Sequence, residues 1–199
     1  MDMMKLLLTL VLMMDMSFRF ADAGDFALLV DIANATIYAG SMSQRLADAE
    51  ALPLSGLVSP VAVDYDPVEK MVYWTDKGSQ PTHKISRARL DGSNQMIVVE
   101  DLRTPLGMAL DVESRMLYWS DFALEHIGRA RMDGTGSKEI IVDNLDSPQT
   151  IVVDHRNGHI YWTDWGLSRI ERANLDGSSR QIIIETDLGI PHGVAIYGK

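Results

Sequence analysis

The sequence predicts an all-β fold, a β-propeller of four-stranded antiparallel blades, and three observations support this prediction. A tetrapeptide of two aromatic residues, a hydroxyl residue and an aspartate recurs at intervals of 45 and 43 residues. Each copy follows a proline-led apolar run and precedes an Asp-Gly turn signal, which gives four short strands per repeat. Evenly spaced strands with a period of ~43 residues are typical of propeller blades.

The tetrapeptide and its two flanking markers define three complete copies. Glycine takes a positive φ without strain, which makes Asp-Gly a strong hairpin-turn signal. One buried aromatic side chain removes about 150–250 Å² from water, so the aromatic pairs predict an apolar layer between stacked blades. The tetrapeptides are Tyr73-Trp74-Thr75-Asp76, Tyr118-Trp119-Ser120-Asp121 and Tyr161-Trp162-Thr163-Asp164; the turns are Asp91-Gly92, Asp133-Gly134 and Asp176-Gly177; the opening prolines are Pro60, Pro105 and Pro148.

The repeat divides the chain into segments that hold about four blade equivalents. In the second copy we expect strands at about 108–111, 116–120, 127–132 and 139–142. A degenerate front copy keeps the strand spacing but lacks the aromatic pair, and the last strand expected is Gly193 to Tyr197. This end strand can in principle pair with the front copy and complete its sheet. The expected segments are a signal peptide (1–23), a degenerate leading blade (24–59), three repeats (60–104, 105–147, 148–190) and the first strand of a next blade (191–199).

The N-terminus has the features of a secretory signal peptide. Lys5 precedes an apolar run from Leu6 to Met14, and Ala21-Asp22-Ala23 places small residues where signal peptidase cuts, after Ala23. A plain N-terminal helix is the alternative. We therefore expect a secreted chain, or one on the extracellular side of the plasma membrane. The tripeptide beginning at Asn34 is then a usable glycosylation sequon.

Composition excludes several classes of function. The chain has a formal net charge of −10, which disfavours binding to nucleic acid phosphates. It contains no cysteine, so disulfides, thiol chemistry and cysteine-based metal sites are impossible. No apolar stretch is long enough to span a bilayer. We expect no cofactor and no metal.

In register, the pattern Pro…Asp, Tyr-Trp-Thr/Ser-Asp, Ile-x-Arg-Ala and x-Asp-Gly resembles the YWTD, or class B, repeat of the low-density lipoprotein receptor family, over roughly Leu28 to Gly198. The resemblance implies an extracellular six-bladed propeller of the kind found in lipoprotein receptors, Wnt co-receptors and nidogen. It also implies polar links, inside and between blades, from the tetrapeptide aspartate and a following arginine. These residues are Asp76, Asp121 and Asp164 with Arg87, Arg129 and Arg172.

The chain departs from the family pattern in length. It has about four blade equivalents instead of six, no flanking cysteine-rich modules and no transmembrane segment. A partial chain is the simplest interpretation, and a closed four-bladed ring is the rival.

The resemblance implies a binding role, which we expect on the loops of the top face, because surface loops can vary without disturbing packed strands. Phe122 and Trp165 occupy the same place in adjacent repeats and are candidate anchors for a partner. For Trp165 the alternative is a rim aromatic residue that packs on its neighbouring blade. The full set of candidate ligand-binding residues is Phe122, His126, Trp165, Leu106, Gln149 and His192.

The expected ligand is a secreted or extracellular protein. One hypothesis is a receptor ectodomain of endocytic or Wnt co-receptor type. The other is a secreted basement-membrane component of nidogen type.

An enzyme is the weakest interpretation. Some six-bladed propellers are calcium-dependent hydrolases with carboxylates and a histidine around the central channel. Here only His192 has a central position, without an acid beside it in the same ring of residues, and His155 and His159 are expected in a solvated turn. The sequence contains no nucleophile–base pairing, phosphate loop or metal-ligand spacing, so no catalytic residue is expected.

Overall fold

The structure is a computed structural model that describes residues 9–11, 25–78 and 83–197. These residues form sixteen strands and no helix, and therefore no helix that could cross a membrane. Most of the predicted signal peptide, and part of the loop that follows Asp76, lie outside the described residues.

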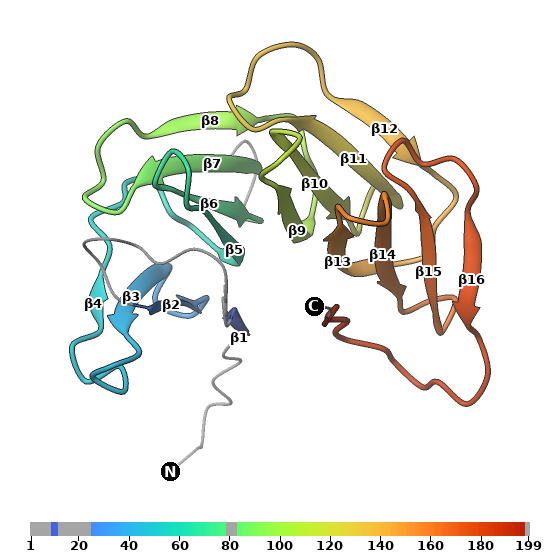
Figure 1. Cartoon of the computed structure of the whole chain (residues 1–199), viewed down its shortest axis with the longest axis horizontal. Coiled ribbons are helices and arrows are strands. Elements are labelled where there is room, and N and C mark those ends of the chain that lie inside the picture. The colour runs from blue at the N-terminus through green and yellow to red at the C-terminus, as the bar shows by residue number, and fades with distance from the viewer. Residues whose placement is uncertain (1–8, 12–24, 79–82, 198–199) are drawn as a thin grey trace.

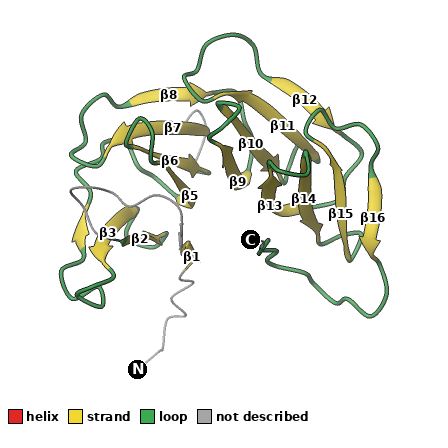
Figure 2. Ribbon diagram, viewed as in Figure 1, coloured by secondary structure: helices red, strands yellow, loops and turns green. Residues whose placement is uncertain are grey.

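The strands form four antiparallel sheets in which neighbours in sequence are neighbours in space (Figures 1 and 2). The first blade contains β1 (Thr9–Val11), β2 (Phe26–Asp31), β3 (Thr36–Ser41) and β4 (Glu50–Ala51). The second contains β5 (Pro60–Asp66), β6 (Met71–Asp76), β7 (Lys84–Arg89) and β8 (Met96–Val99). The third contains β9 (Pro105–Asp111), β10 (Met116–Asp121), β11 (His126–Arg131) and β12 (Glu139–Val142). The fourth contains β13 (Pro148–Asp154), β14 (His159–Asp164), β15 (Arg169–Asn174) and β16 (Gln181–Ile184).

Each blade contacts the next in the series through one strand. β2 of the first blade contacts β5 of the second, β5 contacts β9 of the third, and β9 contacts β13 of the fourth. Together they form an arc whose two ends are the first and fourth blades (Figure 1). The predicted all-β fold of about four blades is therefore confirmed. The closed four-bladed ring is not the arrangement found.

The two chain ends differ from expectation. Residues 191–197 form no strand, although 193–197 was expected to be one. The place beside β2 is taken instead by β1, which pairs in the register Leu10↔Leu29. An edge can pair with only one further strand, so in the full chain β1 occupies the place expected for the C-terminal segment.

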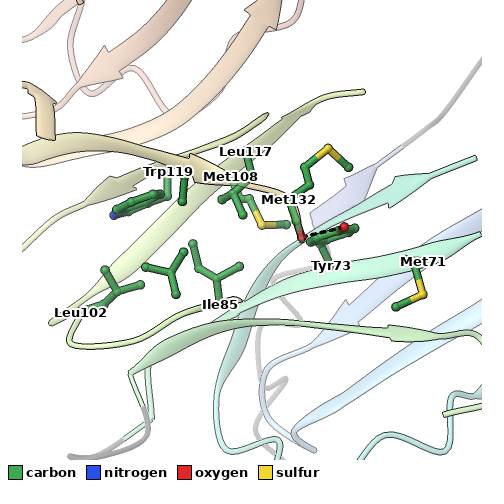
Figure 3. Packing of buried hydrophobic residues seen from close by; sticks show 10 residues of the cluster. Met71, Tyr73, Ile85, Leu102, Met108, Leu117, Trp119 and Met132 are labelled. Carbon is green, nitrogen blue, oxygen red and sulfur yellow. Dashed lines mark hydrogen bonds between the residues drawn. The ribbon is translucent and has the colours of Figure 1, made fainter. Parts of the chain in front are cut away.

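Apolar side chains fill the space between successive blades. Between the second and third blades, Tyr73 and Ile85 face Leu117 and Trp119 (Figure 3). Trp74, Trp119 and Trp162 are all fully buried. At about 25 cal/mol per Å², burying one tryptophan contributes roughly 4–6 kcal/mol as an upper estimate. The aromatic pairs of the tetrapeptides thus serve mainly to fill the apolar space between blades.

Trp119 also explains the glycine at position 128. Gly128 lies opposite Trp119 in the β10–β11 register, and a Cβ there would come within 2.2 Å of the indole ring. Any side chain at this position would therefore push Trp119 out of the layer between the blades.

The fourth blade has an uncovered outward face. Val99 and Val142, at the ends of β8 and β12, are 4% and 5% exposed because the next blade covers them. Ile184 ends β16 in the equivalent place and is 42% exposed. The last residue of the outer strand is therefore buried in the second and third blades and exposed in the fourth, where no further blade follows in the arc.

Val142→Ala should lower the free energy of unfolding by roughly 1–3 kcal/mol, because it leaves a cavity between two blades. Ile184→Ala should change it by less than about 0.5 kcal/mol. Urea unfolding followed by tryptophan fluorescence measures both. Equal losses would mean that the outward face of the fourth blade is covered in solution.

Candidate functional site

The top loops are held by the tetrapeptide aspartates, which end β6, β10 and β14 and are fully buried. The Asp121 carboxylate accepts hydrogen bonds from the backbone N–H groups of Arg103 (2.8 Å) and Thr104 (2.9 Å), which lead into the blade. It also accepts one from the N–H of Leu124 (3.2 Å), in the loop that follows. Asp121 therefore joins the segment that enters its blade to the loop between the second and third strands, and these two sets of loops form the top face.

The other copies repeat this arrangement. Asp76 accepts from the N–H groups of Val58 and Ser59, both at 2.8 Å. Asp164 accepts from those of Asp146 (2.9 Å) and Leu167 (3.0 Å). Burial raises the pKa of Asp164 above its ordinary value, although these two bonds act in the opposite direction.

The hydroxyl of the tetrapeptide links one blade to the next. Ser120 Oγ accepts from Gly107 N–H (2.9 Å) in its own blade and donates to the carbonyl of Gln149 in the fourth blade. Thr75 Oγ1 accepts from Ala62 N–H (2.9 Å) and approaches the carbonyl of Leu106 at 3.5 Å. The tetrapeptide hydroxyls thereby hold the backbone carbonyls of Leu106 and Gln149, which follow the opening prolines of the third and fourth blades.

The candidate residues after the prolines have different environments. Leu106 is half-buried, Gln149 is buried and His192 is exposed. The carbonyl of His192 accepts from Thr150 Oγ1 at 2.7 Å, which holds the C-terminal segment on the fourth blade although it forms no strand. The Gln149 amide nitrogen is buried without a hydrogen-bond partner in the described part of the chain.

Both candidate aromatic anchors are half-buried. The N–H of Phe122 donates to the carbonyl of Thr104 (2.9 Å), and that of Trp165 donates to the carbonyl of Ser147 (3.2 Å). The Trp165 ring meets the His192 ring edge-on, with centroids 4.5 Å apart. Trp165 therefore packs on the C-terminal segment and keeps part of its surface accessible, and its role as an anchor for a partner stays a prediction.

His126 begins β11 and is half-buried. Burial lowers the pKa of its imidazole, only partly offset by the nearby carboxylate of Asp121. The ring is therefore neutral at physiological pH.

Sequence reasoning missed two leucines. Leu124 and Leu167 are 39% and 36% exposed, and each stands three residues after its tetrapeptide aspartate, which accepts a hydrogen bond from its N–H. Phe122-x-Leu124 and Trp165-x-Leu167 thus repeat one pattern on adjacent blades. The pattern is visible in the sequence once the copies are aligned on the aspartate.

The arginines that follow the tetrapeptides do not all act alike. Arg87 donates to Tyr73 Oη (3.1 Å), which donates in turn to the carbonyl of Met132 in the third blade (3.0 Å; Figure 3). Arg129 donates to the carbonyl of Leu175 in the fourth blade (3.0 Å). Arg172 bonds Gln181 within its own blade (3.0 Å). Two of the three therefore take part in links between blades.

Asn34 lies in the exposed turn between β2 and β3. Its Nδ2 donates to Asp31 Oδ2 (2.7 Å), and its backbone N–H donates to Oδ1 (3.0 Å). These bonds lower the pKa of Asp31. The side chain is on the surface, and its glycosylation stays a prediction.

Both histidines expected in a solvated turn differ from expectation. His159 is half-buried and begins the strand β14, where its ring meets that of Tyr161. His155 is not simply solvated: Nδ1 lies 2.8 Å from Asp111 Oδ1 and Nε2 lies 2.9 Å from Glu113 Oε2, both in the preceding blade. Local sequence gave no signal for this contact, because the acids are more than forty residues away. In the described part of the chain, no group of three histidine or acidic residues could hold a metal ion.

Comparison with known proteins identifies the repeat. Mouse Nidogen-2 is 40% identical over 101 residues, which are 50% of this chain and 7% of Nidogen-2. Human Low-density lipoprotein receptor-related protein 5 is 42% identical over 90 residues, which are 42% of this chain and 5% of that protein. The chain therefore spans only a small part of these relatives.

A solved structure has the same architecture. The crystal structure of a Nidogen/Laminin complex contains a chain that matches with a TM-score of 0.70 and 32% identity, over 79% of this chain and 61% of that chain. The family profile described as Low-density lipoprotein receptor repeat class B matches residues 70–112, 115–155 and 158–197. These repeats form a non-enzymatic protein-binding module. The resemblance seen in the sequence is confirmed, and the chain belongs to the low-density lipoprotein receptor class B repeat family.

Proposed function

We propose that the chain is an extracellular protein-binding module whose top face binds a secreted or extracellular protein. The observation that supports this most is the repeated pair of an aromatic residue and an exposed leucine, Phe122 with Leu124 and Trp165 with Leu167. Partly buried aromatic residues lose little side-chain entropy on binding and are frequent hot spots of interfaces. The buried aspartates hold the backbone of both loops, so the surface is preorganised.

Two biological settings remain for this binding role. We propose a part of a receptor of the lipoprotein-receptor-related type, with an endocytic or Wnt co-receptor role, because Low-density lipoprotein receptor-related protein 5 is among the relatives. A matrix component of nidogen type is the second candidate. It is favoured by the match to Nidogen-2 and by the likeness to a nidogen chain solved with laminin.

Binding of the purified chain to immobilised laminin and to lipoprotein and Wnt-class ligands tests the role and separates the two settings. Leu167→Ser and Trp165→Ala should each weaken binding of the true ligand about tenfold, because each removes an apolar contact at the centre of the proposed surface. Ile97→Ser is the matched control, since Ile97 is an exposed apolar residue on the outer strand β8 (49%, against 36% for Leu167).

Laminin binding that the two top-face variants weaken would favour the matrix setting. Binding of a lipoprotein or Wnt-class ligand that the same variants weaken would favour the receptor setting. If Ile97→Ser weakened binding as much as the top-face variants, the proposal that the top face binds the ligand would be wrong.

We also propose that residues 1–23 are a cleaved signal peptide and that Asn34 is glycosylated. The signal peptide includes β1, so cleavage would expose the edge of β2. Expression in animal cells should give a secreted chain that begins at Gly24 and loses mass on treatment with an N-glycanase. Asn34→Gln should abolish that mass change. An intracellular chain that retains Met1 would refute the signal peptide.

A further inference from the structure

Successive blades are joined by an ion pair at the end opposite to the top loops. Arg115 lies in the turn between β9 and β10 and reaches back to the second blade. Its Nη1 is 2.7 Å from Asp66 Oδ2, and its Nη2 is 2.7 Å from Glu69 Oε1. Asp66 ends β5 and is fully buried. One oxygen of Asp66 accepts the N–H of Val68, and the guanidinium of Arg115 offsets the cost of burying the other at this joint.

The next joint has an equivalent aspartate and a nearby glutamate, Glu113, but a different cation. Asp111 ends β9 as Asp66 ends β5, and its side chain is also buried. In the fourth blade, Gly158 occupies the place of Arg115, immediately before the second strand. The cation comes instead from His155, near the start of the turn, whose two ring nitrogens contact Asp111 (2.8 Å) and Glu113 (2.9 Å).

A neutral imidazole has one N–H group and one acceptor nitrogen, and only the imidazolium can donate from both nitrogens. Because both nitrogens of His155 face carboxylate oxygens, the contact pattern requires the charged ring. Arginine keeps its charge at every physiological pH, whereas histidine does not. The two joints therefore differ in one physical respect, which is whether their cation titrates.

We propose that the contact between the third and fourth blades is a pH-responsive clamp. The ion pairs of His155 with Asp111 and Glu113 stabilise it when the ring is protonated and are lost when the ring is neutral. The ion pairs of Arg115 keep the preceding contact at every physiological pH. The clamp joins the two blades that present Phe122 and Trp165. Its acids lie at one end of β9, and Leu106 lies near the other end, on the top face.

The charges around His155 favour the protonated ring. The contact with Asp111 raises the pKa of His155 most, desolvation lowers it, and the charges of Asp111, Glu113 and Asp154 raise it further. Glu113 and Asp111 belong to the preceding blade, and Asp154 precedes His155 in its own. Arg115, in the same turn as these two acids, pairs with Asp66 and Glu69 instead. Ser114 Oγ is a neutral neighbour at 3.4 Å.

The direction of the pH effect follows from this shift. A histidine whose pKa is raised in the folded state stabilises the fold fully below its unfolded value of about 6.5 and loses that contribution as pH rises through the folded pKa. The clamp should therefore tighten as pH falls from about 8 to about 6. His155 is 36% exposed, so screening by solvent and salt keeps the effect modest.

Other groups also titrate near this range, so the experiment must compare variants. Burial raises the pKa of Asp64 to about 6, which also favours the folded state at lower pH. The lowered pKa of His126 acts in the opposite sense. The difference between wild type and a His155 variant removes both contributions.

The test is the thermal unfolding midpoint of the full chain at pH 5.5, 7 and 8.5 in wild type and His155→Gln. The wild-type midpoint should exceed that of the variant by about 1–2 °C at pH 5.5, and the difference should vanish at pH 8.5. Arg115→His should install a similar pH dependence at the preceding joint. His159→Gln is the matched control, because His159 forms no ion pair in the described part of the chain.

A direct measurement keeps the proposal falsifiable if a variant fails to fold. In wild type, an NMR titration of the His155 ring should give a pKa above about 6.5, and Glu113→Gln should lower it. A ring pKa at or below that value would overturn the clamp. A difference between wild type and His155→Gln that does not change with pH would overturn it equally.

Discussion

Asp76, Asp121 and Asp164 are buried carboxylates, and burying a carboxylate costs several kcal/mol unless hydrogen bonds satisfy it. Here the donors are backbone N–H groups from the segment that enters the blade and from the loop after its second strand. The interactions that offset the cost of burial therefore also fix the loops of the top face. This arrangement allows loop side chains such as Phe122 and Trp165 to vary between blades while their backbone positions stay constant.

The repeat matched by the family profile is offset by one strand from the blade seen in the structure. The first matched repeat, residues 70–112, runs from β6 through β8 to β9, so it includes three strands of one blade and the first strand of the next. Ser120 bonds the third blade to the fourth. Each blade is thus positioned by its neighbour, and apolar packing such as that of Trp119 fills the space between them.

The periodic features were the predictable ones. In the third blade, strands expected at 116–120 and 139–142 are found at Met116–Asp121 and Glu139–Val142, because local turn signals set their ends. The first strand begins at Pro105, earlier than the expected 108, since pairing with β10 continues past a bulge. The contacts of His155 and the burial of Gln149 could not be predicted. Both depend on residues in another blade, which a single repeat does not reveal.

The role of the buried aspartates is tested most directly by native-state hydrogen exchange. The amides of Thr104 and Leu124 lie outside the strands but bond to Asp121. The structure predicts that both exchange as slowly as amides within β10, because opening them requires opening the blade. Exchange at the rate of ordinary exposed loops would contradict the account, since the top face would then be neither preorganised nor held by the aspartate.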